Sequence, residues 1–262
     1  MDDPFFIKTI EIFKDFDEVD ALALGGSMAT GKNDSASDYD VYVYLNKDLC
    51  TEKRKNALSQ TCKYMEINNT FFEPEDDCTL NSGTNLELIY RHTSNTIHTL
   101  SNHLENHIAW NGYTTCVCHS VLNAKILYDD KGIYSSILER FSMPYPEQLR
   151  KNIISLNRNL LEGKMVSYCG QLEKAIMRND EVSINHRLTE VIKAYFDILF
   201  ALNKAFHPGE KRMIDFARDL CEWLPADFEK NLHGLLAANG KDKLPIVREV
   251  VSNLDDLIVK YA

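Results

Sequence analysis

The sequence predicts an α+β fold, with a small mixed-sheet domain over residues 1–140 and an all-α helical bundle over residues 141–262. Two observations indicate this division. Apolar runs of strand length occur only in the first 140 residues, and long amphipathic segments fill the chain after residue 146. The fold class therefore follows from where each periodicity occurs along the chain.

The first domain begins with a predicted helix over residues 4–16, because Phe6, Ile10 and Phe13 recur at helical spacing after Pro4. Short runs of aliphatic, β-branched or aromatic residues predict strands at 20–24, 39–45, 86–91 and 126–132. Helical patterns are found at 51–65, 96–109 and 115–125, and the sequence EPEDD at 73–77 is typical of an acidic loop.

The second domain consists of predicted helical segments separated by turn-forming residues. The segments cover 146–178, 181–206, 210–222, 226–238 and 243–261. The breaks fall at Asn179-Asp180, His207-Pro208-Gly209, Leu224-Pro225 and Asn239-Gly240. No strand is predicted after residue 140.

Residues 26–32, GSMATGK, match the G-x-x-x-x-G-K pattern of a phosphate-binding P-loop. Asn33 stands where a P-loop has the Ser or Thr that binds Mg²⁺. Only five residues separate Lys32 from Asp38, where strand character begins, so the helix that a P-loop requires does not fit. The sequence therefore disfavours a P-loop.

Asp38 and Asp40 give the same stretch a different interpretation. Residues two apart on a strand point to one face, roughly 6.6 Å apart along the strand axis. Two carboxylates placed in this way repel each other unless a cation lies between them, and Mg²⁺ prefers such oxygen ligands. Gly26 and Ser27, which follow the preceding strand, are suited to hold triphosphate oxygens.

Glu87 is the candidate for a third carboxylate. It lies between Leu86 and Leu88 in a predicted strand, so it points away from the face that these leucines occupy. Glu87 could ligate a metal ion or act as the base that accepts a proton from an acceptor hydroxyl. Glu73 and Glu75 are the other candidates for this position.

This arrangement resembles the nucleotidyltransferase superfamily, which has the DNA polymerase β fold. The pattern shared with that superfamily is Gly-Ser, then Asp-x-Asp on a strand, then an acidic residue between hydrophobic ones, and it covers about residues 20–91. The segments ILYDDKG (126–132) and NKAFHPGEKR (203–212) are similar to the two-domain bacterial enzymes that modify antibiotics, the aminoglycoside and lincosamide nucleotidyltransferases.

The resemblance implies roles for particular residues. Asp38, Asp40 and Glu87 would hold two Mg²⁺ ions, while Gly26 and Ser27 would bind the triphosphate of ATP or another NTP. Family members often carry an arginine where this chain has Thr30, so Lys32 either takes over that cationic role or is a solvated loop residue. Lys211 or Lys204, from the helical domain, would reach the phosphates.

The function implied is Mg²⁺-dependent transfer of an adenylyl group from ATP to a hydroxyl of a small molecule, with release of pyrophosphate. An aminoglycoside or lincosamide acceptor would make the protein an antibiotic-resistance enzyme. Two alternatives remain. The chain could be a catalytically silent or antitoxin-like module that binds a protein partner, or it could adenylylate a protein.

Charge favours a cationic acceptor over a nucleic acid. Residues 1–140 contain 22 acidic and 12 basic side chains, whereas residues 141–262 contain 17 of each. An acidic surface attracts small cations and repels polynucleotide phosphates.

Composition predicts a cytoplasmic protein. The seven cysteines include no CxxC pair, the N-terminus is acidic where a signal peptide would be basic, and no apolar run approaches the roughly 18 residues that span a bilayer. We therefore expect no membrane partner, and the sequence leaves a homodimer open.

Overall fold

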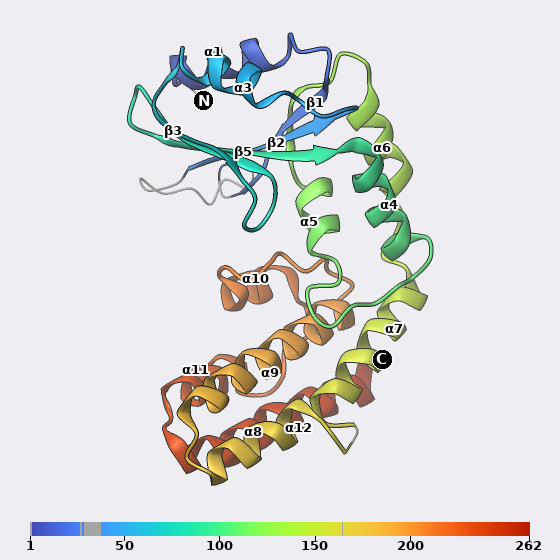
Figure 1. The fold of residues 1–262 in the computed structure, drawn as a ribbon. Coiled ribbons are helices and arrows are strands. Elements are labelled where there is room, and N and C mark those ends of the chain that lie inside the picture. Colours follow the sequence, from blue (N-terminus) through green and yellow to red (C-terminus); the bar gives the residue numbers. More distant parts are fainter. Residues whose placement is uncertain (1, 27, 29–37, 164) are drawn as a thin grey trace. The chain divides into compact units, whose positions relative to one another are not determined.

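A computed structural model of the protein describes residues 2–26, 28, 38–163 and 165–262, and these form two compact units (Figure 1). The first unit comprises Met1–Ser101 and Ser120–Met143, and the second comprises Asn102–His119 and Pro144–Ala262. The sequence placed one boundary after residue 140. The structure instead moves residues 102–119 into the second unit and ends the first at residue 143.

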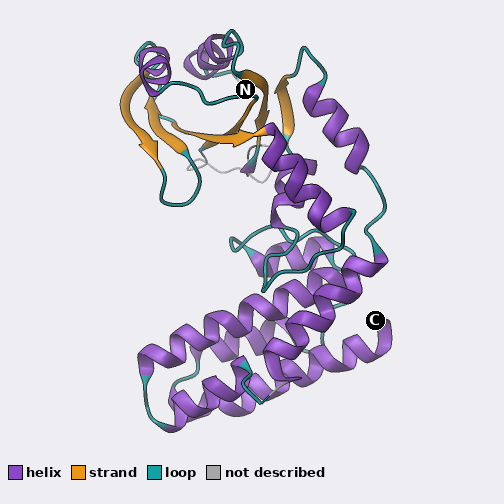
Figure 2. Cartoon of the chain, turned by 45° about the vertical axis from the view of Figure 1, so that its right-hand side comes forward, coloured by secondary structure: helices purple, strands orange, loops and turns teal. Residues whose placement is uncertain are grey.

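The first unit is built on a six-stranded mixed sheet, shown in orange in Figure 2, which confirms the predicted fold class. The strand order is β3-β4-β5-β2-β1-β6. Only β2 and β5 pair in parallel, and the other four neighbouring pairs are antiparallel. The strands are β1 (Val19–Leu24), β2 (Tyr39–Leu45), β3 (Cys62–Asn69), β4 (Glu75–Leu80), β5 (Asn85–His92) and β6 (Lys125–Tyr128).

One face of this sheet packs against two helices, α1 (Pro4–Phe13) and α3 (Thr51–Leu58). The main-chain N–H groups of Phe5 and Phe6 donate to the Asp3 carboxylate, which caps the start of α1. The core between helices and sheet contains Phe6, Phe13, Leu58, Val41, Val43, Leu86 and Leu88. Because side chains alternate along a strand, Asp40 and Glu87 belong to the opposite face.

Two predictions for the first unit were wrong. Helix α3 ends at Leu58 instead of near residue 65, and residues 62–69 form β3. The expected acidic loop at 73–77 contains the start of β4. The inward side chains of β4 are Asp76, Cys78 and Leu80, and the aspartate conceals the alternation of a half-buried strand. Arg54 pairs with Asp76 at 2.7 Å. This ion pair offsets part of the free-energy cost of burying the Asp76 carboxylate.

The remaining helices are α4 (Thr93–Leu104), α5 (Cys116–Leu122), α6 (Ile133–Phe141), α7 (Glu147–Arg158), α8 (Tyr168–Met177), α9 (Glu181–Leu202), α10 (Met213–Leu220), α11 (Phe228–Ala237) and α12 (Lys243–Tyr261). Helix α6 belongs to the first unit, and α4 and α5 contribute residues to both. A π-helical turn at Asn159–Gly163 interrupts the segment predicted as one helix at 146–178.

The second unit is helical, and its described residues contain no strand, as predicted. Helix α9 packs against α7 and α8, and nearly every side chain of its C-terminal half is buried. Asp197 of α9 is buried and accepts hydrogen bonds from Thr114 and Asn157. These bonds attach residues 110–115 to the helices that follow residue 144.

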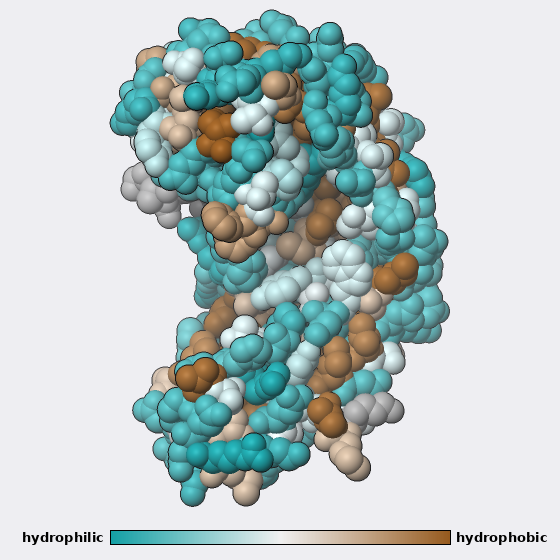
Figure 3. All heavy atoms as spheres, viewed as in Figure 1, coloured by the Kyte–Doolittle hydropathy of each residue, from teal (hydrophilic) through white to brown (hydrophobic). Residues whose placement is uncertain are grey.

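Most of the surface visible in Figure 3 is hydrophilic, with scattered apolar patches. Among the described helices, none has both the length and the apolar composition needed to cross a bilayer.

Candidate functional site

The parallel pairing of β2 and β5 brings two predicted site residues together. Asp40 is the direct neighbour of Glu87 in the register, so both carboxylates project from the face of the sheet opposite the core. Asp38 precedes the first residue of β2 and is half-buried. Short-range alternation placed Asp40 and Glu87 on polar faces of their strands, but only the register makes them neighbours.

Gly26 follows β1, and its missing side chain leaves space for the Asp40 carboxylate. A Cβ atom at Gly26 would lie 1.6 Å from Oδ2 of Asp40, and the backbone there has a φ of +60°. Gly25 donates its N–H to the main-chain oxygen of Asp40 at 2.8 Å. The two glycines therefore bring the backbone after β1 against the acidic strand, and the predicted approach of this backbone to a phosphate stays a prediction.

The negative charges of neighbouring carboxylates in the site disfavour ionisation of Glu87. Burial, and then the negative charge of Asp40, raise the pKa of Glu87 to about 7. A hydrogen bond with Asp40 and the charges of Asp38 and Asp77 act in the same direction. Such a group either carries a proton at neutral pH or requires a cation beside it.

Asp77 is a site residue that the sequence did not identify. It pairs with Glu87 across β4 and β5, and Glu66 pairs with Asp77 across β3 and β4. Asp40, Glu87, Asp77 and Glu66 therefore form a row of four carboxylates across four adjacent strands. The sequence does not reveal Asp77, because the buried Asp76 conceals the alternation of β4.

Arg91 lies on the same face as Glu87 but pairs with another acid. Its guanidinium donates to both carboxylate oxygens of Glu73, at 2.8 and 2.6 Å, and its Cζ lies 4.0 Å from the centre of the Tyr42 ring. The Arg91 side chain is largely buried. Glu73, an alternative to Glu87 in the sequence, is thus engaged by Arg91.

The other predicted residues do not enter this description of the site. Ser27 and Lys32 lie outside the described residues. Lys211 is exposed in the second unit, and Lys204 pairs with Glu147 at 3.3 Å. Phosphate binding by either lysine stays a prediction.

A cavity of about 360 Å³ in the first unit lies at the other ends of β2 and β5. Among the residues that line it are Leu45, Arg54, Tyr90 and His92. None of the carboxylates in the row reaches this cavity, so it is separate from the candidate site.

The donor set fits Mg²⁺ in kind, since Asp38, Asp40 and Glu87 supply the hard oxygen ligands that this ion prefers. Within the described residues, however, no three His, Cys, Asp or Glu side chains are gathered closely enough to enclose a metal ion. Burial and the charge of Asp40 raise the pKa of Glu87, so a bound cation would favour the ionised form of this carboxyl group. The chemistry of these side chains therefore suits Mg²⁺. Strand pairing places two of the three predicted ligands, Asp40 and Glu87, next to each other.

Two known families match different parts of the chain. Residues 8–103 match the family described as polymerase beta, nucleotidyltransferase. Residues 110–213 match a domain of unknown function, DUF4037. No curated protein matches the sequence.

Several solved structures resemble the chain distantly, and the following three have TM-scores below 0.5. A nucleotidyltransferase-like protein from Exiguobacterium sibiricum has 12% identity and a TM-score of 0.45, with 95% of this chain and 72% of that one covered. An aminoglycoside 6-adenyltransferase from Bacillus subtilis has 11% identity and a TM-score of 0.32, with coverage of 97% and 90%. The Thermotoga maritima CCA-adding enzyme has 11% identity and a TM-score of 0.30, with coverage of 98% and 80%.

Proposed function

We propose that the protein transfers an adenylyl group from ATP to a hydroxyl of a small, cationic acceptor, because residues 8–103 match the polymerase beta nucleotidyltransferase family. The observation that carries the proposal is the in-register pair of Asp40 and Glu87 beside Gly26. This geometry supports the proposal because it sets two carboxylates beside a glycine, a combination suited to binding a metal–triphosphate complex.

The reaction exchanges a phosphoanhydride bond of ATP for a phosphoester bond to the acceptor. The acceptor oxygen forms a bond to the α-phosphorus of ATP, the bond from that phosphorus to the bridging oxygen breaks, and pyrophosphate leaves with the electron pair. The proton of the acceptor hydroxyl passes to a base. Glu87 suits this role because a base is most effective when its pKa lies near the working pH.

Asp38 and Asp40 would hold Mg²⁺, with Glu87 as the base or the third ligand. The ion, when bound, would neutralise phosphate charge and orient the α-phosphate. The chain itself contributes positioning. Asp40 is held by its strand pairing with Glu87 and by close contact with Gly26, which would keep its carboxylate in a defined position for the reactants.

The acidic row supports a cationic acceptor, because clustered carboxylates raise the local concentration of small cations. An aminoglycoside or a lincosamide has the required amine and hydroxyl groups. Such an acceptor would make the protein an antibiotic-modifying enzyme.

The test follows pyrophosphate release and α-phosphate transfer with ATP, Mg²⁺ and a panel of aminoglycosides and lincosamides. Asp40→Asn and Glu87→Gln should each lower kcat/KM by on the order of a hundredfold or more, because each removes a carboxylate that would bind Mg²⁺ or accept the proton. Asp48→Asn is the matched control, since the Asp48 side chain is 96% exposed and interacts with His92 at the far end of β2.

The proposal is wrong if no acceptor is modified and Asp40→Asn leaves binding of Mg²⁺–ATP unchanged. Nucleotide binding that depends on Asp40, without transfer to any small molecule, would instead favour a protein acceptor.

A further inference from the structure

The turn between β3 and β4 exposes two adjacent phenylalanines. Phe71 is 89% exposed and Phe72 is 93% exposed. Single apolar side chains are common on protein surfaces, but two neighbouring aromatic rings in contact with water indicate a surface that binds something. Neither ring supports the core, so their presence has no explanation in the packing of the first unit.

Hydrogen bonds anchor this turn on both sides to residues of the acidic face. The Asn69 side chain accepts from the Phe71 N–H at 3.0 Å and donates to Asp77 at 2.9 Å. On the other side of the turn, Glu73 receives the two hydrogen bonds of Arg91. The rings are therefore carried by a turn in a defined position.

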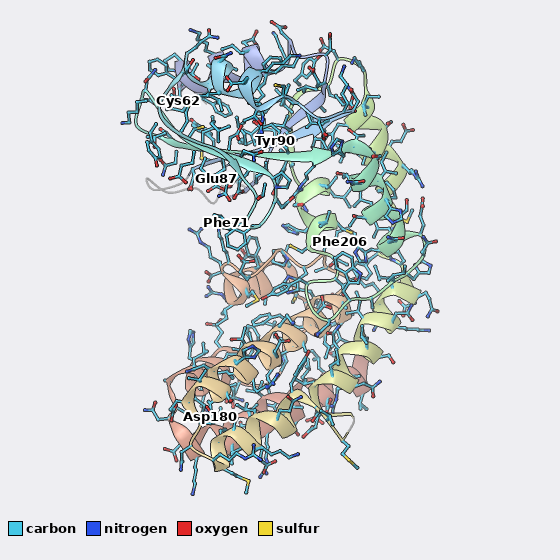
Figure 4. The ribbon with its side chains drawn as sticks, viewed as in Figure 1. Cys62, Phe71, Glu87, Tyr90, Asp180 and Phe206 are labelled. Carbon is cyan, nitrogen blue, oxygen red and sulfur yellow. The ribbon has the colours of Figure 1, made fainter. Side chains whose placement is uncertain are left out.

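The turn lies on the same side of the sheet as Glu87, as Figure 4 shows for Phe71 and Glu87. Its end meets β5, where the Tyr90 N–H donates to the main-chain oxygen of Pro74 at 2.8 Å. Gly26 follows β1, on the other side of β2 in the strand order. The glycine and the turn therefore flank Asp40 and Glu87 from opposite directions.

This arrangement separates the two reactants. In an in-line displacement, the attacking and leaving oxygens lie on opposite sides of the phosphorus atom. If the Gly26 side holds the leaving pyrophosphate, as the proposed function requires, then the acceptor enters from the side of Glu87 and the turn. Phe71 and Phe72 are thus placed to meet the acceptor and not the pyrophosphate.

We infer that Phe71 and Phe72 bind the acceptor, and that the acceptor is an amine-bearing molecule with an apolar face as well as a hydroxyl group. Phenyl rings attract both apolar surface and cations, the latter through the negative face of the ring. A wholly hydrophilic polyamine would use only part of this surface. The inference rests on the proposed function and specifies its substrate class.

The experiment measures binding by titration calorimetry in the presence of Mg²⁺ and α,β-methylene-ATP, which cannot transfer its adenylyl group. Two probes are used: lincomycin, an amine with an apolar face, and kanamycin, a hydrophilic polyamine. The variants are Phe71→Ala/Phe72→Ala and the conservative Phe71→Tyr/Phe72→Tyr. Val259→Ala, which truncates a side chain that is 88% exposed in the second unit, is the control.

We expect lincomycin to bind the native protein more tightly than kanamycin. The double alanine variant should weaken lincomycin binding by about tenfold or more. Tyrosine should restore this binding because it keeps the ring, and Val259→Ala should change nothing. The affinity for α,β-methylene-ATP should be the same in all variants, because the rings face the acceptor side.

Several results would overturn the inference: tighter binding of kanamycin, lincomycin binding that survives loss of both rings, or loss of nucleotide affinity in the alanine variant. Failure of both probes to bind would also refute it. In that case, Asp40-dependent binding of the ATP analogue would leave the nucleotide part of the proposed function standing. If the analogue itself does not bind, then the proposed function fails.

Discussion

At the scale of single residues, the candidate site depends on close contact between Gly26 and Asp40. The positive φ of Gly26 suits glycine, and the 1.6 Å separation calculated for an added Cβ leaves no room for a larger residue. The sequence suggested glycine here for its approach to phosphate. The structure adds that the same glycine leaves space for a carboxylate.

Gly26→Ala should therefore displace the Asp40 carboxylate and weaken Mg²⁺–ATP binding by about tenfold or more. Gly132→Ala is the matched control, because Gly132 has a φ of +66° but nothing within 4 Å of its added Cβ. Both variants should lose about 1 kcal/mol of stability from backbone strain. Calorimetric titration and urea unfolding separate the two effects, and equal nucleotide affinity in both variants would contradict the prediction.

His207 predicts a pH dependence of stability in the second unit. It is fully buried between the rings of Tyr113 and Phe200, and its Nδ1 accepts the Gly209 N–H. Burial, together with the charge of His119, lowers the pKa of His207 to about 3. The unfolded chain thus binds a proton at higher pH than the folded one, so stability is lost as pH falls below about 6.5.

The native protein should lose about 2 kcal/mol between pH 7.5 and pH 5 relative to His207→Leu. Burial raises the pKa of Asp197 to about 7, which has the opposite sign, but this contribution is common to both proteins and cancels in the difference. Urea unfolding at the two pH values tests this. An unchanged difference in stability between the two proteins would show that His207 does not titrate as described.

At the scale of elements, the β3–β4 hairpin is held to α3 by a buried ion pair. Arg54 is 6% exposed, and it donates to Asp76, Asn68 and Thr51. Asp76 also accepts from the Tyr90 hydroxyl at 2.7 Å. This ion pair holds Asp76 on the inward face of β4. Because side chains alternate along a strand, Asp77 then lies on the opposite face, beside Glu87.

Arg54→Met should cost about 3–5 kcal/mol, since it leaves a buried carboxylate without its cation. Arg54→Met/Asp76→Asn should recover part of this loss by removing the charge. The control is Lys53→Met, which breaks the more exposed Lys53–Glu18 pair and should cost less than Arg54→Met. Chemical unfolding provides the values, and equal costs for Arg54→Met and Lys53→Met would disprove the role of the buried pair.

At the scale of the whole molecule, the second unit is completed by residues 102–119, which lie far from its helices in sequence. Thr114 donates its N–H and its hydroxyl to Asp197, and Gly112 donates its N–H to Asn157. Without this segment, these buried acceptors would lose their partners.

A fragment of residues 141–262 should accordingly be much less stable than one of residues 102–262. Asp197→Ala in the longer fragment should reproduce part of the deficit, because it leaves the Thr114 donors unpaired. Circular dichroism with urea unfolding is the measurement. If the two fragments unfold at the same urea concentration, residues 102–119 contribute nothing to the second unit.

The sequence predicted much of the fold because its strongest signals are local. The apolar alternation of 39–45 and 86–91 identified two strands and put Asp40 and Glu87 on their polar faces. The hairpin at 62–80 was missed because Asp76 occupies a core position. That placement depends on Arg54, which lies 22 residues earlier in the chain.

The sequence alone determined the fold class, the family resemblance of residues 20–91, and which side chains are chemically suited to a nucleotidyl-transfer site. Only the tertiary structure decided that Glu87 lies between Asp40 and Asp77, that Arg91 is engaged by Glu73, and that residues 102–119 join the second unit. Periodicity reports which face of one element is buried. Strand register and long-range hydrogen bonds are set by packing between residues distant in the chain, and that packing decides which side chains meet.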